Sequence, residues 1–263
     1  MLTDIVCPVC HGSLTEGECR GCGRSYALDG VPDLTPMPPP DPDVRARWSL
    51  WERLQANGER SYEIDPPSSL SVGQREDARA FARFSDLEGR VLDVGCGPQA
   101  FPSYAEGFGG ELVGVDPLVG VQPRRFAFVK GLAEYLPFPD TSFDRVLFAT
   151  SLDHVLSPRR AVEEARRVLR PDGRVCVWLG ELSAIPPLRR LAQRTWHTIG
   201  RFIVRQTPMS RAKFEVPHGA VDAFHFMHLD EPTVSRWLRD AGLVVDAVER
   251  PLLGHCFLSA RRL

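Results

Sequence analysis

The sequence lacks a hydrophobic run long enough to cross a membrane, and it also lacks an excess of basic charge. Its first residues do not form a secretory signal peptide, because Met1–Val6 is short and carries Asp4. The formal net charge is −2, which argues against nucleic acid as the main partner. The seven cysteines do not form a disulfide framework in this setting, so these absences together predict a cytoplasmic location.

What is present is typical of a globular protein. The hydrophobic fraction is 43% and the charged fraction is 25%. A chain of 263 residues can bury a full core in one large domain and still carry a small appendage.

Residues 1–35 contain two C-x-x-C pairs, at 7–10 and 19–22. Each pair can present two thiolates to one ion, so the two pairs complete a tetrahedral zinc site. A redox dithiol needs only one such pair, and a segment this small cannot stabilise itself by core burial alone. The pattern therefore predicts a zinc ribbon over 1–35, without an open coordination position for catalysis, whose structural Zn²⁺ is bound by Cys7, Cys10, Cys19 and Cys22.

Residues 36–84 are predicted to hold a linker and two helices. Five prolines between Pro36 and Pro42 indicate a stiff linker. Helices are predicted over 44–55 and 71–84, with an irregular segment at 62–69 between them. On the first helix, Trp48, Trp51 and Leu54 share one apolar face. The two tryptophans and Tyr62 are candidate substrate contacts, although packing on the core is the more frequent role of such residues.

The stretch VLDVGCGP at 91–98 reads as a buried strand that runs into a glycine-rich turn. Asp93 lies at the carboxyl end of that strand, where open α/β sheets bind ligands. Gly95 and Gly97 allow the backbone to approach a ligand closely. Asp116 ends the next apolar strand, about twenty residues further on, a spacing that suits a carboxylate bound to ribose hydroxyls.

The rest of the chain alternates strands with helices, which indicates an α/β fold with a mostly parallel sheet. Helices are predicted over 101–106, 158–169 and 231–241, the last with Asp230 as its N-cap. The segment 116–125 is predicted to be a loop, because it is short and contains two prolines. Strands are predicted over 90–94, 111–115, 126–130, 143–149, 173–179, 244–249 and 255–261.

Three later blocks complete a resemblance to the class I methyltransferases that use S-adenosylmethionine (SAM). They are GLAEYLPFPDTSFD at 131–144, SLDHVLSP at 151–158 and VLRPDG at 168–173. A nicotinamide-binding domain would share the first turn but not these blocks. The resemblance is to the type 11 branch, which methylates quinones, sterols and natural products, and it covers about residues 85–180. The ribbon resembles the zinc-binding extension fused to some bacterial methyltransferases.

The resemblance implies a Rossmann-like sheet of seven strands over 85–263, with a substrate lid inserted at about 182–228. It also implies that Asp93 attracts the SAM ammonium group and that Asp116 binds the ribose. Two departures from the family are Gln99, at a usual glycine, and Leu132, at a usual aspartate that bonds adenine; Glu134 or backbone groups are expected to compensate. The implied cofactor residues are Asp93, Gly95, Cys96, Gly97, Asp116, Pro117, Leu132, Ala133, Glu134, Ala149 and Thr150.

Three histidines are candidates for a general base, which methyl transfer needs when the acceptor must lose a proton. His154 follows the fourth predicted strand and is the first candidate, and ordering its own loop is the alternative role. His225 and His228 are the second candidates. The sequence gives only weak support for metal binding by His225 and His228, because no third ligand lies near them in the sequence.

Residues 187–213 show an apolar helical face beside a stripe of arginines, and no acid occurs between Glu181 and Glu215. A solvated amphipathic lid is favoured. A site for an anionic acceptor is the next alternative, followed by contact with a membrane surface or RNA.

These features together predict a SAM-dependent methyltransferase that acts on a small molecule, such as a natural product or an anionic or isoprenoid-type metabolite. One alternative is an rRNA or tRNA base methyltransferase, since bacterial ribosomal-RNA guanine methyltransferases have a similar layout. The other is a scaffold that binds SAM without turnover.

Overall fold

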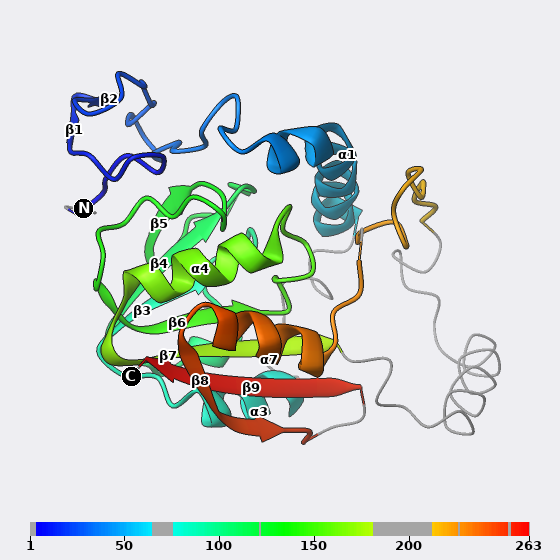
Figure 1. The fold of residues 1–263 in the computed structure, drawn as a ribbon. Helices are drawn as coiled ribbons and strands as arrows, with labels where there is room; N and C mark the ends of the chain where they lie inside the picture. The colour runs from blue at the N-terminus through cyan, green and yellow to red at the C-terminus, as the bar shows by residue number, and fades with distance from the viewer. Residues whose placement is uncertain are drawn as a thin grey trace.

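The computed structural model describes residues 4–64, 76–120, 122–180, 212–225, 227–251 and 254–262. At its centre is a seven-stranded sheet in the order β5-β4-β3-β6-β7-β9-β8 (Figure 1). Neighbouring strands from β5 to β7 are parallel, whereas β9 is antiparallel to both β7 and β8. The strands are β3 (Arg90–Val94), β4 (Glu111–Asp116), β5 (Ala127–Lys130), β6 (Phe143–Ala149), β7 (Leu169–Gly180), β8 (Leu243–Glu249) and β9 (His255–Arg262).

All seven predicted strands are therefore confirmed, and so is the Rossmann-like α/β class. Alternate residues of each strand face opposite layers, as the two-residue period of a strand requires. In β3, for example, Leu92 and Val94 pack in one core cluster and Val91 packs in another. Helices α4 (Pro158–Val168) and α7 (Glu231–Asp240) cover the first face, while α3 (Glu76–Ser85) and the 3₁₀ turn η2 (Ser103–Ala105) cover the second (Figure 1).

Two local predictions near the helix ends have different outcomes. The N-cap of α7 is confirmed, because the Asp230 carboxylate accepts the Thr233 N–H at 3.0 Å. The helix predicted over 101–106 is wrong, since only the single turn η2 forms there. Pro102 before it is extended and Gly107 after it has a φ of +83°, so the chain leaves the helical region on both sides. After Asp116, which ends β4, the described part of 117–125 is a loop, as its prolines predict.

Helix α1 (Pro42–Ile64) is longer than the predicted span of 44–55 and includes Tyr62, so the expected irregular start at 62 is wrong. Contacts with the rest of the fold stabilise helix α1 beyond the predicted end. Trp51 and Leu54 are buried, and the Asn57 amide donates to the carbonyls of Glu215 and Ala223 at 2.9 and 2.7 Å. Of the remaining predictions, residues 65–69, 71–75 and most of the lid, 182–211, lie outside the described residues.

The N-terminal segment pairs with the edge of the main sheet. It contains a hairpin of β1 (Leu14–Thr15) and β2 (Glu18–Cys19). Further on, the Leu34 N–H donates to the Lys130 carbonyl at 2.8 Å, and the Lys130 ammonium lies 2.7 Å from the Asp33 carboxylate. Leu34 is fully buried in the main core. The segment therefore covers the edge strand β5, which would otherwise expose unpaired backbone groups.

Within these same ranges, no helix combines the length and apolar character that a membrane crossing requires.

Candidate active site

A cavity of about 370 Å³ lies where the carboxyl ends of β3, β4 and β6 meet helix α1. Figure 1 shows α1 lying across this end of the sheet. The volume of the cavity falls within the range of small-molecule sites. The cavity also lies at the edge of the sheet where open α/β folds bind ligands. Its lining includes Trp51, Tyr62, Gly95, Cys96, Gly97, Tyr104, Asp116, Pro117, Leu132, Ala133, Glu134, Ala149, Thr150 and His154.

The glycine turn after β3 has a backbone that only glycine adopts easily. Gly95 and Gly97 have φ values of +76° and +67°. A Cβ added to Gly95 would lie 2.3 Å from the Cβ of Ser151, so this position is also closed to any side chain. At Gly97 the nearest atom would be the Tyr62 hydroxyl at 3.5 Å, which leaves the turn open toward the cavity.

Asp116 links this turn to the end of β4. Its carboxylate accepts the N–H groups of Gly97 at 2.8 Å and Leu118 at 2.7 Å. The residue is only 6% exposed, and burial raises the pKa of its carboxyl to about 6, although both hydrogen bonds oppose the rise. A buried carboxylate at the cavity wall, with two of its acceptor positions used by the backbone, retains others for hydroxyl donors.

Asp93 lies one layer behind the cavity wall. The Tyr104 hydroxyl, which does line the cavity, donates to its Oδ2 at 2.6 Å. Its Oδ1 is buried and has no hydrogen-bond partner among the described residues. Burial raises the pKa of this carboxyl to about 7, against the effect of the Tyr104 hydrogen bond. An unpaired carboxylate oxygen in this position fits a cationic group such as an ammonium.

Arg124, which the sequence did not reveal, and Gln99 brace the loops around the turn. The Arg124 guanidinium donates to the carbonyls of Gly97 at 2.7 Å and Leu118 at 2.9 Å, and it stacks 3.7 Å from the Phe128 ring centroid. The Gln99 amide donates to the Cys96 carbonyl at 2.9 Å, so this departure from the family closes the turn. No local pattern predicts such contacts for Arg124, because it lies in a loop.

At the expected adenine end, the structure places Leu132 and Glu134 at the cavity wall. Leu132 is 2% exposed and forms an apolar wall with Trp51. The Glu134 carboxylate accepts the Ser157 N–H at 2.7 Å, and the Glu134 carbonyl accepts from Arg160 Nε at 3.0 Å. These groups also bind the start of α4, while Glu134 itself lines the cavity, so its compensation for the missing aspartate stays a prediction.

The three candidate histidines lie at increasing distance from the cavity. His154 lines it, and burial lowers the pKa of its imidazole. The ring of His225 lies 4.3 Å from that of His154, behind the wall. His228 is further out, with 51% of its side chain exposed. The Trp51 indole donates to the His154 carbonyl at 3.1 Å, so the loop that carries His154 is also held by α1.

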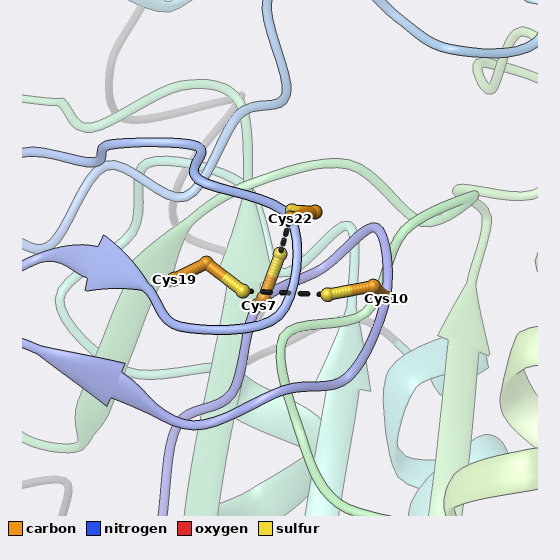
Figure 2. Close-up of side chains that lie close together, drawn as sticks. All are labelled: Cys7, Cys10, Cys19 and Cys22. Carbon is orange, nitrogen blue, oxygen red and sulfur yellow. Dashed lines mark hydrogen bonds between the residues drawn. The ribbon is translucent and has the colours of Figure 1, made fainter.

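The four N-terminal cysteines converge from two loops, as Figure 2 shows. The Sγ atoms of Cys7 and Cys22 are 3.7 Å apart, and those of Cys10 and Cys19 are 3.3 Å apart. Zinc–thiolate bonds of about 2.3 Å in a tetrahedron place sulfur atoms ~3.8 Å apart. The cluster therefore has the donor set and nearly the dimensions of a structural zinc site.

Comparison with known proteins gives the family. A family model described as a methyltransferase domain matches residues 92–177. The demethylmenaquinone methyltransferase of Paenarthrobacter aurescens is 30% identical over 190 residues, which cover 66% of this chain and 70% of that protein. The protein of the same name from Clavibacter sepedonicus is 29% identical over 162 residues, or 58% of this chain and 64% of its own length. The chain belongs to the class I SAM-dependent methyltransferases.

A solved structure supports the fold over nearly the whole chain. The 1,6-didemethyltoxoflavin N1-methyltransferase of Burkholderia thailandensis aligns with a TM-score of 0.55 and 18% identity, covering 94% of this chain and 99% of that one. At this identity the likeness shows the fold alone. The chain spans between about half and two thirds of the length of the first curated relatives, 52% for one and 64% for another.

Proposed function

We propose that the protein transfers the methyl group of SAM to a small-molecule acceptor. The observation that carries this proposal is the buried Asp116 carboxylate beside the glycine turn, at the wall of a cavity of about 370 Å³. In a family that uses SAM, this arrangement supplies acceptors for a ribose and a backbone surface against which the rest of the cofactor can lie.

The residues present fit the separate parts of SAM. The Asp93 carboxylate, through its unpaired Oδ1 and the hydroxyl of Tyr104, favours the ammonium end. Asp116 accepts from the ribose hydroxyls, and the apolar wall around Leu132 contacts the adenine. SAM supplies an activated methyl group on a sulfonium. The main task of the protein is then to hold the acceptor in line with that group and to exclude water.

The acceptor side of the cavity favours a flat, largely apolar molecule. Trp178 and Phe224 contribute aromatic surface there, and His154 contributes a polar edge. Two relatives are named demethylmenaquinone methyltransferases, which supports an acceptor of the quinol or phenol type. The arginine stripe predicted on the lid lies outside the described residues and has no part in this argument.

We also propose that the cysteine cluster binds one structural Zn²⁺. Its role is to fix the small N-terminal segment that covers the β5 edge, because that segment has few core residues of its own.

The test is a transfer assay with methyl-labelled SAM and a panel of reduced naphthoquinols, phenols and carboxylates. Label should appear in at least one of these compounds, and the Asp116→Ala variant should abolish it. Transfer only to ribosomal or transfer RNA would replace this proposal with the RNA alternative. SAM binding without transfer to any compound or RNA would favour the scaffold.

A further inference from the structure

A second cluster of metal-ligating side chains lies at the acceptor side of the cavity. We propose that Asp153, His154 and His225 bind one divalent transition-metal ion, with open coordination positions directed at the cavity. Their ligand atoms all lie within 4.8 Å of one another. The site itself does not depend on the proposed methyl transfer. Its role, which is to hold an oxygen of the acceptor, rests on that proposal.

The hydrogen bonds of both histidines fix which ring nitrogen carries the proton. The Nδ1 of His154 lies 3.2 Å from the Phe224 carbonyl, a group that can only accept. The Nδ1 of His225 lies 2.8 and 2.9 Å from the two carboxylate oxygens of Asp222. Each Nδ1 is therefore the N–H donor, and in the neutral ring each Nε2 presents its lone pair.

Both Nε2 atoms face the carboxylate of Asp153. The distances are 3.8 Å from His154 to Oδ1 and 3.6 Å from His225 to Oδ2. Two lone pairs directed at a carboxylate repel it, and a metal cation bound between them turns this repulsion into attraction. Metal bonds of about 2.0–2.2 Å place neighbouring ligand atoms ~3 Å apart in octahedral and ~3.4 Å apart in tetrahedral geometry, so each of these two distances exceeds the metal-bound value by less than ~1 Å.

The surroundings match those of bound metals. A ligating histidine usually donates its other N–H to a carboxylate or carbonyl, which is what Asp222 and Phe224 provide.

The donor set indicates the kind of ion. Two imidazoles and one carboxylate suit first-row divalent metals such as Fe²⁺, Co²⁺ and Zn²⁺, and they leave positions free for other ligands. The closed cysteine cluster, by contrast, leaves none. Because His154 lines the cavity, a free position at the new site would be taken by an oxygen of the acceptor. The chemical class implied is an acceptor with a metal-binding hydroxyl or keto-enol group.

The experiment titrates Co²⁺ into the full-length, zinc-loaded protein, with calorimetry and visible absorption as readouts. One Co²⁺ per chain should bind, with weak d–d bands and without the sulfur-to-metal charge-transfer bands that displacement of zinc from cysteines would produce. The Asp153→Asn and His225→Gln variants should each weaken binding at least ~10-fold, and Asp222→Asn should weaken it ~10- to 100-fold. The exposed His218→Gln variant, in the same segment, is the matched control and should bind normally.

X-ray absorption of the Co²⁺-loaded wild type gives a readout that does not need the variants to fold. It should show nitrogen and oxygen ligands with the scattering pattern of imidazole. Absence of Co²⁺ binding, or binding unaffected by Asp153→Asn in a folded variant, overturns the proposal. SAM affinity is measured separately. A protein that binds Co²⁺ but does not bind SAM contradicts the proposed function and still supports the metal site.

Discussion

The Asp116→Asn variant separates the stability of the free protein from its affinity for SAM. The substitution keeps the shape of the side chain but removes its charge and turns one acceptor into a donor. That donor then faces the N–H of either Gly97 or Leu118, both of which bond the carboxylate in the wild type. In the free protein, loss of the charge stabilises the fold, whereas the unpaired N–H destabilises it. In the complex, both changes weaken the binding of SAM.

The magnitudes follow from the burial of Asp116. A pKa raised from 3.8 to about 6 means that keeping this carboxylate ionised at neutral pH costs about 3 kcal/mol of stability. Asparagine removes that cost but leaves one buried N–H unpaired, at ~1–3 kcal/mol. The free energy of unfolding of the free protein should therefore change by less than ~2 kcal/mol. Loss of charge-assisted bonds to the ribose should remove ~2–4 kcal/mol of binding, a roughly 30- to 700-fold weaker affinity.

The assay is calorimetric titration of SAM and S-adenosylhomocysteine, together with urea unfolding of the free protein. Asp33→Asn is the matched control, because Asp33 pairs with Lys130 at the sheet edge and does not line the cavity. That variant should bind SAM normally. A folded Asp116→Asn protein whose SAM affinity stays within threefold of the wild type would refute the assignment of Asp116 to the ribose.

Three further predictions concern the turn, the second acid and the ribbon. Gly95→Ala should lower the free energy of unfolding by at least ~1–3 kcal/mol in urea titrations, because its Cβ meets Ser151 at 2.3 Å; a neutral result would contradict the turn geometry. Burial raises the pKa of Asp93 to about 7, above its unfolded value of 3.8, so its contribution to stability is full below about pH 4 and is lost as the pH rises to about 7. SAM binding near pH 6.5 should therefore release a proton, seen as a dependence of the binding enthalpy on buffer ionisation heat; the dependence should shrink in Asp93→Asn. Cys22→Ser should abolish zinc in native mass spectra and lower the melting temperature but retain SAM binding, since the cavity lies on other elements; unchanged zinc content would contradict the ligand set.

The sequence allowed the sheet to be predicted because its strands are short apolar runs bounded by turns. Arg90–Val94 and Phe143–Ala149 match their predicted bounds, since most residues of both strands are apolar and buried. The prediction for 101–106 was wrong because helical spacing over six residues is too weak to outweigh the flanking Pro102 and Gly107. The length of α1 depends on contacts of Asn57 with a segment more than 150 residues away, as its bonds to Glu215 and Ala223 show.

The cavity residues on strand ends were predictable for the same reason, because each lies directly after a buried strand. The directions in which their side chains point could not be predicted. Nothing in the sequence shows that the Glu134 carboxylate turns to Ser157, or that Arg124 binds carbonyls from two loops. The cluster of Asp153, His154 and His225 depends on the approach of two loops that are distant in sequence, so it becomes visible only in the fold.

The most direct test of the central claim is competition between S-adenosylhomocysteine and NAD⁺ for the wild-type protein in calorimetric titrations. The cavity should bind one S-adenosylhomocysteine per chain, and added NAD⁺ should not change the affinity for S-adenosylhomocysteine. Failure to bind S-adenosylhomocysteine, or its displacement by NAD⁺, would contradict the assignment of this cavity to SAM.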